Sequence, residues 1–172
     1  ELGEARAAGL LGERWEEICR AYGVTVVSMA APFGQTVSAE TVAEALRRHP
    51  EARAVLMQHS ESSTGVLHDV QGIAAATRGT PAILIVDAVS SLGIADLRLD
   101  EWGVDLVVAG SQKGLMLPPG LSFCALSDKA WGHVTASRLP KYYFDLTAEG
   151  KSVAKNEAHF TPAVSIMLGL RE

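Results

Sequence analysis

The chain has 172 residues, of which 48% are hydrophobic and 20% are charged, and its formal net charge is -5. This length and composition exclude wholesale disorder and predict one domain with a sizeable core. The acidic balance and the absence of a Lys/Arg cluster exclude a nucleic-acid-binding surface. Two cysteines are too few for a disulfide framework, and no apolar run reaches the ~18 residues of a membrane span. We therefore expect a cytoplasmic protein with no nucleic-acid or membrane partner.

Predicted helices and strands alternate along the chain, as judged from apolar periodicity and from capping and turn residues. In chain order they are a helix over 4–22, a strand over 24–29, a helix that begins after Ser38 and ends near 49–50, a strand over 54–58, a helix over 69–77, a strand over 82–86, a helical turn over 99–102, strands over 104–109 and 121–126, and a helix over 128–137. Residues 139–160 are expected to be irregular, and Thr161-Pro162 opens a last helix. The alternation predicts an α/β fold with a mainly parallel sheet, and the near-continuous apolar strands predict helices on both of its faces.

Residues able to carry chemistry follow three of the predicted strands. The strand over 54–58 leads into residues 59–65, which are rich in hydroxyls. The strand over 82–86 leads into Asp87, and the strand over 104–109 leads into Gly110-Ser111-Gln112-Lys113-Gly114. Because ligands bind at the carboxyl ends of the strands in an open α/β sheet, we expect these segments to meet at one edge. A lysine able to form a Schiff base, and an acid able to face a pyridinium nitrogen, are what pyridoxal phosphate chemistry requires.

Each of these features also has an ordinary structural explanation. Lys113 alone could be a surface lysine, Asp87 could cap the next helix, and the hydroxyls of 62–64 could form a turn. The glycines and apolar residues around Lys113 favour a partly buried amine, and burial favours the neutral, nucleophilic form. His59 and His68 lack the companions of a zinc motif, so no metal is expected. Motifs for a P-loop, a dinucleotide-binding turn and a hydrolase nucleophile elbow are absent from the sequence.

Taken together, the three segments resemble the class V branch of the fold-type I pyridoxal-phosphate aminotransferases. Within that branch they look most like the alanine–glyoxylate and serine–glyoxylate aminotransferases. The resemblance rests on residues 59–65, 86–93 and 110–120, with Lys113 following Asp87 by 26 positions (113 minus 87). It implies that the chain is the central part of a fold-type I large domain, with pyridoxal 5'-phosphate as its cofactor.

The resemblance also assigns positions around that cofactor. They are Ser62 at the phenolic oxygen of the ring (with Ser63 as an open alternative), Asp87 at the pyridine nitrogen, Val89 on one face of the ring, Gln112 at the phosphate, Lys113 as the Schiff-base lysine and catalytic base, and Thr161 at the phosphate of the neighbouring subunit. The cofactor is therefore expected at the interface of a homodimer. Leu11 stands where the family usually has an aromatic residue that stacks on the ring.

The reaction implied by the resemblance is transamination between a small amino acid, alanine or serine, and glyoxylate or pyruvate. One alternative is a cysteine-desulfurase or lyase-type class V enzyme, although those usually place a histidine where this chain has Gln112. Another alternative is a catalytically silent, truncated large-domain fragment. We expect residues 1–172 to be an incomplete large domain that lacks an N-terminal phosphate loop and a C-terminal small domain, and to be inactive by itself.

Overall fold

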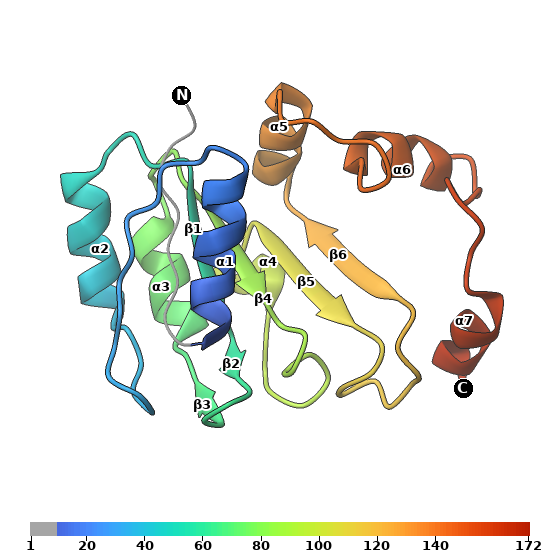
Figure 1. Ribbon diagram of the computed structural model, residues 1–172, viewed down its shortest axis with the longest axis horizontal. Coiled ribbons are helices and arrows are strands. Elements are labelled where there is room, and N and C mark those ends of the chain that lie inside the picture. Colours follow the sequence, from blue (N-terminus) through green and yellow to red (C-terminus); the bar gives the residue numbers. More distant parts are fainter. Residues whose placement is uncertain (1–9) are drawn as a thin grey trace.

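A four-stranded sheet with the strand order β1–β4–β5–β6 forms the centre of the computed structural model, which describes residues 10–172 and their side chains from Gly12 onward (Figure 1). The strands are β1 (Ala54–Gln58), β4 (Ile83–Asp87), β5 (Leu106–Gly110) and β6 (Ser122–Leu126). The first three run parallel to one another, and β6 is antiparallel to β5. A short antiparallel hairpin, β2 (Ser60–Glu61) and β3 (Val66–Leu67), follows β1.

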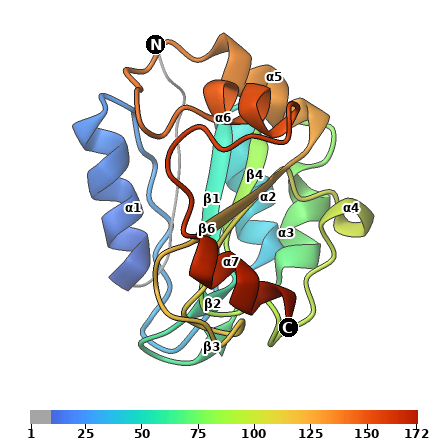
Figure 2. The same cartoon turned by 90° about the vertical axis from the view of Figure 1, so that its right-hand side faces the viewer.

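Helices cover both faces of the sheet (Figure 2). One face is covered by α1 (Leu10–Ala21), and the other by α2 (Ala39–Arg48), α3 (Val70–Thr77) and α4 (Leu99–Trp102). After β6 the chain forms α5 (Asp128–Ala136), α6 (Leu146–Val153) and α7 (Val164–Arg171). The predicted α/β fold, with a mainly parallel sheet and helices on both faces, is confirmed. In the part of the chain that the structure describes, no helix is both long enough and apolar enough to cross a membrane.

The core lies between the sheet and the pair α2 and α3. Hydroxyl and carboxylate caps start these two helices, since Ser38 accepts a hydrogen bond from the Thr41 N–H and Asp69 accepts one from the Gly72 N–H. The residues that fill this core include Val42, Leu46, Val55, Met57, Ile73, Ala74, Leu84, Val86 and Val107. Burial of each large aliphatic side chain contributes roughly 2 kcal/mol to folding.

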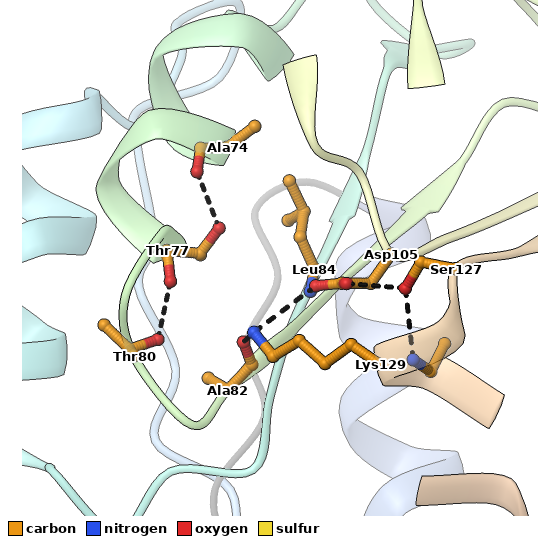
Figure 3. A network of polar contacts seen from close by, with 9 residues as sticks. Ala74, Thr77, Thr80, Ala82, Leu84, Asp105, Ser127 and Lys129 are labelled. Carbon is orange, nitrogen blue, oxygen red and sulfur yellow. Dashed lines mark hydrogen bonds and ion pairs between the residues drawn. The ribbon is translucent and has the colours of Figure 1, made fainter. Parts of the chain in front are cut away.

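A buried carboxylate joins the elements at the edge of the sheet where β4 and β5 begin (Figure 3). Asp105 accepts hydrogen bonds from the Leu84 backbone N–H at 3.0 Å and from the Ser127 hydroxyl at 2.8 Å. The Lys129 ammonium lies 3.6 Å from the same carboxylate and donates to the Ala82 carbonyl oxygen at 2.5 Å. Each carboxylate oxygen therefore accepts a hydrogen bond, and the network connects β4, β5 and α5.

Some sequence predictions differ from the structure. The predicted strand over 24–29 is wrong. Val26 forms only an isolated bridge, and the other residues of this segment form no strand ladder. The region 139–160, expected to be irregular, contains α6, whose N-cap Asp145 accepts hydrogen bonds from the N–H groups of Thr147 and Ala148. The hairpin β2–β3 was not predicted either. The last helix begins at Val164, after Thr161-Pro162, and the predicted helix over 4–22 is described only from residue 10.

Candidate cofactor site

The ends of the three parallel strands meet at one edge of the sheet, at the bottom of Figure 1. The register pairs Gln58 of β1 with Asp87 of β4, and Asp87 with Val108 of β5. The hydroxyl-rich segment 59–65, Asp87 and the lysine loop that begins at Gly110 therefore leave the sheet side by side. The structure thus brings together the three segments on which the sequence-based hypothesis rests.

Asp87 is the last residue of β4, and both its backbone and its side chain accept hydrogen bonds. Its backbone carbonyl accepts the His59 N–H at 2.8 Å, and its Oδ1 accepts the Val89 N–H at 2.9 Å. Burial raises the pKa of the carboxyl above its usual range. The hydrogen bond from the Val89 backbone acts in the opposite direction, while the negative charge of Glu61 adds to the rise. The result is a fixed acid with an increased affinity for a proton.

The two serines that were open candidates point in different directions. The Ser62 hydroxyl lies 2.6 Å from the Ser90 hydroxyl, on the turn that follows Asp87. Ser63 instead donates to Glu61 Oε1 with both its backbone N–H, at 3.0 Å, and its hydroxyl, at 2.8 Å. Of the two hydroxyls, that of Ser62 therefore belongs to the same side of the site as Asp87.

The lysine loop connects β5 to β6, and a buried serine closes it. The Ser111 hydroxyl donates to the Pro118 carbonyl at 2.7 Å and accepts the Leu121 N–H at 3.3 Å. The Ser111 backbone N–H also donates to the Leu121 carbonyl, and the Leu117 N–H donates to the Ser111 carbonyl, both at 3.1 Å. Sequence reasoning missed this role, for which the only signal is a small polar residue directly after a buried strand.

Gly114 brings the lysine loop into contact with the turn after Asp87. A Cβ atom at this position would lie 2.2 Å from the Leu92 carbonyl oxygen and 2.8 Å from Ile94 Cγ1. Only glycine allows the two backbones to come this close. The residue after Lys113 therefore fixes the distance between the loop that carries the amine and the turn that carries the acid.

Lys113 itself is exposed, so the expectation of a partly buried amine is wrong. The apolar residues after it do not fold over it: Met116 is 90% exposed and adopts a left-handed φ of 54°, which turns the chain away. Gln112 is also exposed, and its Oε1 lies only 2.7 Å from the place a Gly110 Cβ would occupy, so its carboxamide folds back over the end of β5.

A model of the class-V aminotransferase family matches residues 9–172. The chain belongs to this family. It is 41% identical over 166 residues to an L-aspartate–glyoxylate aminotransferase of Paracoccus denitrificans, covering 94% of this chain and 42% of that protein. It is 43% identical over 166 residues to a protein of a Synechococcus species named soluble hydrogenase, small subunit, covering 95% of this chain and 43% of that protein.

Among solved structures, an alanine–glyoxylate aminotransferase from a Nostoc species has a TM-score of 0.92 and 30% identity, and the match covers 99% of this chain and 46% of that one. The chain therefore spans about half the length of the class-V aminotransferases it matches. The expected resemblance to this family is confirmed.

The groups at this edge fit the cofactor that the class-V family implies. A carboxylate suits a pyridinium nitrogen, serine hydroxyls suit a phenolic oxygen, and an exposed amine suits an aldehyde. In addition, the buried Ser91 hydroxyl and Gln58 Nε2 have no hydrogen-bond partner among the described residues. Buried polar atoms of this kind call for a ligand or water. No three His, Cys, Asp or Glu side chains within residues 10–172 are grouped so as to hold a metal ion.

Val89 and Thr161, the two remaining positions assigned from the family resemblance, lie in different parts of the structure. Val89 is half-buried next to Asp87, as its proposed contact with the ring requires. Thr161 is exposed and belongs to the segment that joins α6 to α7, which runs on the β6 side of the molecule (Figure 1). The Leu11 side chain lies outside the described residues.

A buried pair of histidines is a second feature that sequence reasoning missed. His59 and His68 are 2% and 7% exposed, and the His68 N–H donates to the His59 carbonyl at 2.9 Å. Burial lowers the pKa of both imidazoles, and the charge of Glu61 partly offsets this for His68. The Nδ1 atom of each ring has no hydrogen-bond partner in the described part of the chain. The available signal was that His59 directly continues the buried strand β1.

Proposed function

We propose that this chain forms the cofactor-binding core of a pyridoxal-phosphate-dependent aminotransferase that acts between alanine or serine and glyoxylate or pyruvate. The observation that carries the proposal is the position of Asp87 and the Lys113 loop at the ends of two adjacent parallel strands, in contact through Gly114. A carboxylate and an amine at one sheet edge are the two groups that this cofactor requires. The glyoxylate aminotransferases among the relatives support the choice of acceptor.

The described residues would divide the chemistry as follows. When bound, the cofactor supplies a protonated ring that withdraws electrons from the α-carbon of the substrate. Asp87 would hold the proton at the ring nitrogen, and the burial that raises its pKa strengthens its attraction for that proton. Lys113 would anchor the cofactor covalently through Nζ. Once displaced by the incoming amino acid, the same amine would move the proton at the α-carbon.

The other positions would orient the cofactor. Ser62 would donate to the phenolic oxygen, Val89 would pack against one face of the ring, and Gln112 would contact the phosphate. Thr161 would complete the phosphate site of a second subunit, which makes a homodimer part of the proposal.

We also propose that residues 1–172 are an incomplete large domain, with a phosphate loop upstream and an arginine for the substrate carboxylate in a small domain downstream. The half-length match to the relatives supports this. Without bidentate recognition of the carboxylate, these residues alone would neither bind nor orient an amino acid, so we expect no transamination from them. The free cysteines Cys19 and Cys124 support a cytoplasmic location.

A desulfurase or lyase-type reaction is the alternative within the same fold. Enzymes of that type usually place a histidine immediately before the lysine, and Gln112 occupies this position here. A carboxamide cannot exchange a proton as an imidazole does near neutral pH. We therefore favour transamination, and release of sulfide from cysteine by the complete enzyme would reverse this preference.

The anchor is tested by reducing the complete protein with borohydride in the presence of pyridoxal 5'-phosphate and mapping the labelled peptide. We expect the label on Lys113 and its loss in Lys113→Arg, with Lys155→Arg as a matched control that keeps it. A label confined to Lys129, Lys141, Lys151 or Lys155 would contradict the assignment. A panel of amino donors with glyoxylate and pyruvate then identifies the substrates.

A further inference from the structure

The hairpin β2–β3 follows β1 and lies at the edge of the sheet that carries the candidate site (Figure 1). Glu61, the last residue of β2, is only 4% exposed and pairs with Val66 across the hairpin. Its backbone carbonyl accepts the N–H groups of Thr64, at 3.2 Å, and of Gly65, at 2.8 Å. Residues 61–65 therefore form a tight turn that begins at a buried acid.

The Glu61 side chain binds one of the two serines in this turn. Its Oε1 accepts the Ser63 backbone N–H at 3.0 Å and the Ser63 hydroxyl at 2.8 Å. A serine hydroxyl carries a single proton, so the Ser63 hydroxyl has no second proton for another acceptor. An ionised phenolic oxygen can only accept hydrogen bonds, and Ser63 is therefore unsuited to bind it while Glu61 accepts its proton.

Ser62 is in a different position, because its hydroxyl lies 2.6 Å from the hydroxyl of Ser90. Either oxygen can be the donor in this pair. When Ser90 donates, the proton of Ser62 is available to an acceptor in the site. Ser90 belongs to the turn after Asp87, so this hydrogen bond also joins the hairpin to the segment that carries the acid.

We propose that Glu61 is a positioning residue: by keeping Ser63 engaged, it leaves Ser62 as the hydroxyl that donates to the phenolic oxygen of the cofactor. Ser90 completes the arrangement by donating to Ser62. The inference rests on the proposed function and adds a buried carboxylate to the site. Hydrogen bonds to an ionised oxygen are roughly twice as strong as those between neutral groups, so this carboxylate holds Ser63 more firmly than a neutral acceptor would.

The test compares two neutral substitutions of similar size. Glu61→Gln keeps an oxygen that can accept from Ser63, whereas Glu61→Met fills the space without an acceptor. Beside burial, the charge of Glu61 raises the pKa of Asp87. Because both variants lose this charge, the difference between them reports on hydrogen bonding. Glu51→Ala, at an exposed position just before β1, is the matched control.

The readouts are the absorbance of bound pyridoxal 5'-phosphate over a series of pH values and the affinity for the cofactor by equilibrium dialysis, both in the complete protein. A donor at the phenolic oxygen shares its negative charge and weakens its attraction for a neighbouring proton. The midpoint of the absorbance change should therefore lie roughly half to one pH unit higher in Glu61→Met than in Glu61→Gln, and binding should be about fivefold weaker. Glu51→Ala should match the unaltered protein, and equal midpoints in the two Glu61 variants would overturn the inference.

The serines provide an independent test. Ser62→Ala should raise the midpoint, and Ser63→Ala should shift it far less. Adding Glu61→Met to Ser62→Ala should cause no further rise, because the hydroxyl that Glu61 positions has been removed; an equal rise in both backgrounds would overturn the inference. If Glu61→Met does not fold, the two serine variants decide. A midpoint that depends on Ser63 more than on Ser62 would then overturn the inference, and the reverse would support it.

The outcomes also separate this inference from the proposed function. If the unaltered protein does not bind the cofactor through Lys113, the proposed function fails and the inference fails with it. If the cofactor binds there and Ser62→Ala raises the midpoint, while Glu61→Met matches Glu61→Gln, the inference alone fails.

Discussion

At the edge of the sheet where β4 begins, both carboxylate oxygens of buried Asp105 have partners, whereas at the edge where β4 ends, buried polar atoms of His59, His68 and Ser91 have none among the described residues. An unpartnered buried polar group costs about 1–3 kcal/mol, so the second arrangement reduces stability. The comparison indicates that the first edge maintains the fold and the second is kept ready for a ligand. Mutations at the first edge should accordingly lower mainly the stability, and mutations at the second should lower activity or cofactor affinity.

Asp87→Asn should produce the largest difference between activity and stability. Asparagine still accepts the Val89 N–H but cannot hold a proton on the ring nitrogen, so the barrier should rise by several kcal/mol, with each ~1.4 kcal/mol giving a tenfold loss in kcat. The free energy of unfolding should not fall, because burial already disfavours the charged form of this carboxyl and raises its pKa. Turnover within a few-fold of the unaltered enzyme would show that Asp87 is only a structural cap.

The second largest effect is expected from Gly114→Ala, which should lower both the stability and the cofactor affinity. The new Cβ would meet the Leu92 carbonyl oxygen at 2.2 Å, so the lysine loop must move away from the turn after Asp87. We expect a loss of about 3 kcal/mol in unfolding free energy, together with weaker cofactor binding. Gly132→Ala is the matched control, since no atom lies within 4 Å of its added methyl group and alanine favours a helix. Equal behaviour of the two variants would contradict the close approach.

Asp105→Ala should reduce stability and leave cofactor affinity unchanged. It leaves the Leu84 N–H and the Ser127 hydroxyl without their acceptor and the Lys129 ammonium without its counter-charge, which should cost about 2–3 kcal/mol in urea unfolding. Asp100→Ala, at an exposed position of α4, serves as the control. If Asp105→Ala loses cofactor binding but not stability, the proposed division between the two edges is incorrect.

The smallest effect should be a dependence of stability on pH that comes from His59 and His68. Burial lowers their pKa in the folded state, so as the pH falls through about 6.5 the unfolded chain takes up protons first. Their contribution to stability is therefore full above that pH and declines below it. His68→Gln should reduce the loss between pH 7.5 and pH 5.5 by about 1 kcal/mol or less, whereas exposed His159→Gln should not. An unchanged slope in His68→Gln would contradict the assignment.

The difference between the two edges also explains which features could be predicted from the sequence. Apolar runs ending in Asp87 and before Lys113 are local patterns, and the rule that strand ends converge brought them together correctly. The exposure of Lys113 was misjudged because apolar neighbours in sequence do not become a cover unless the chain folds back, and Met116 turns it away. The hydrogen bonds of Asp105 with Ser127 and with the Leu84 N–H join residues that lie far apart along the chain. No spacing along the chain indicates such pairs.

The antiparallel direction of β6 has a consequence for the order of folding. Since β6 returns directly beside β5, the lysine loop is closed by neighbours in sequence, whereas Asp87 reaches it only through the crossover that includes α4. Short closures lose less chain entropy and form earlier than distant ones. The pairing of β5 with β6 should thus be among the first tertiary contacts to form. Ser111 should then protect the Leu121 amide from hydrogen exchange before Asp87 is positioned beside the lysine loop. On this view the nucleophile is positioned first, and the site is complete when β4 pairs with β5.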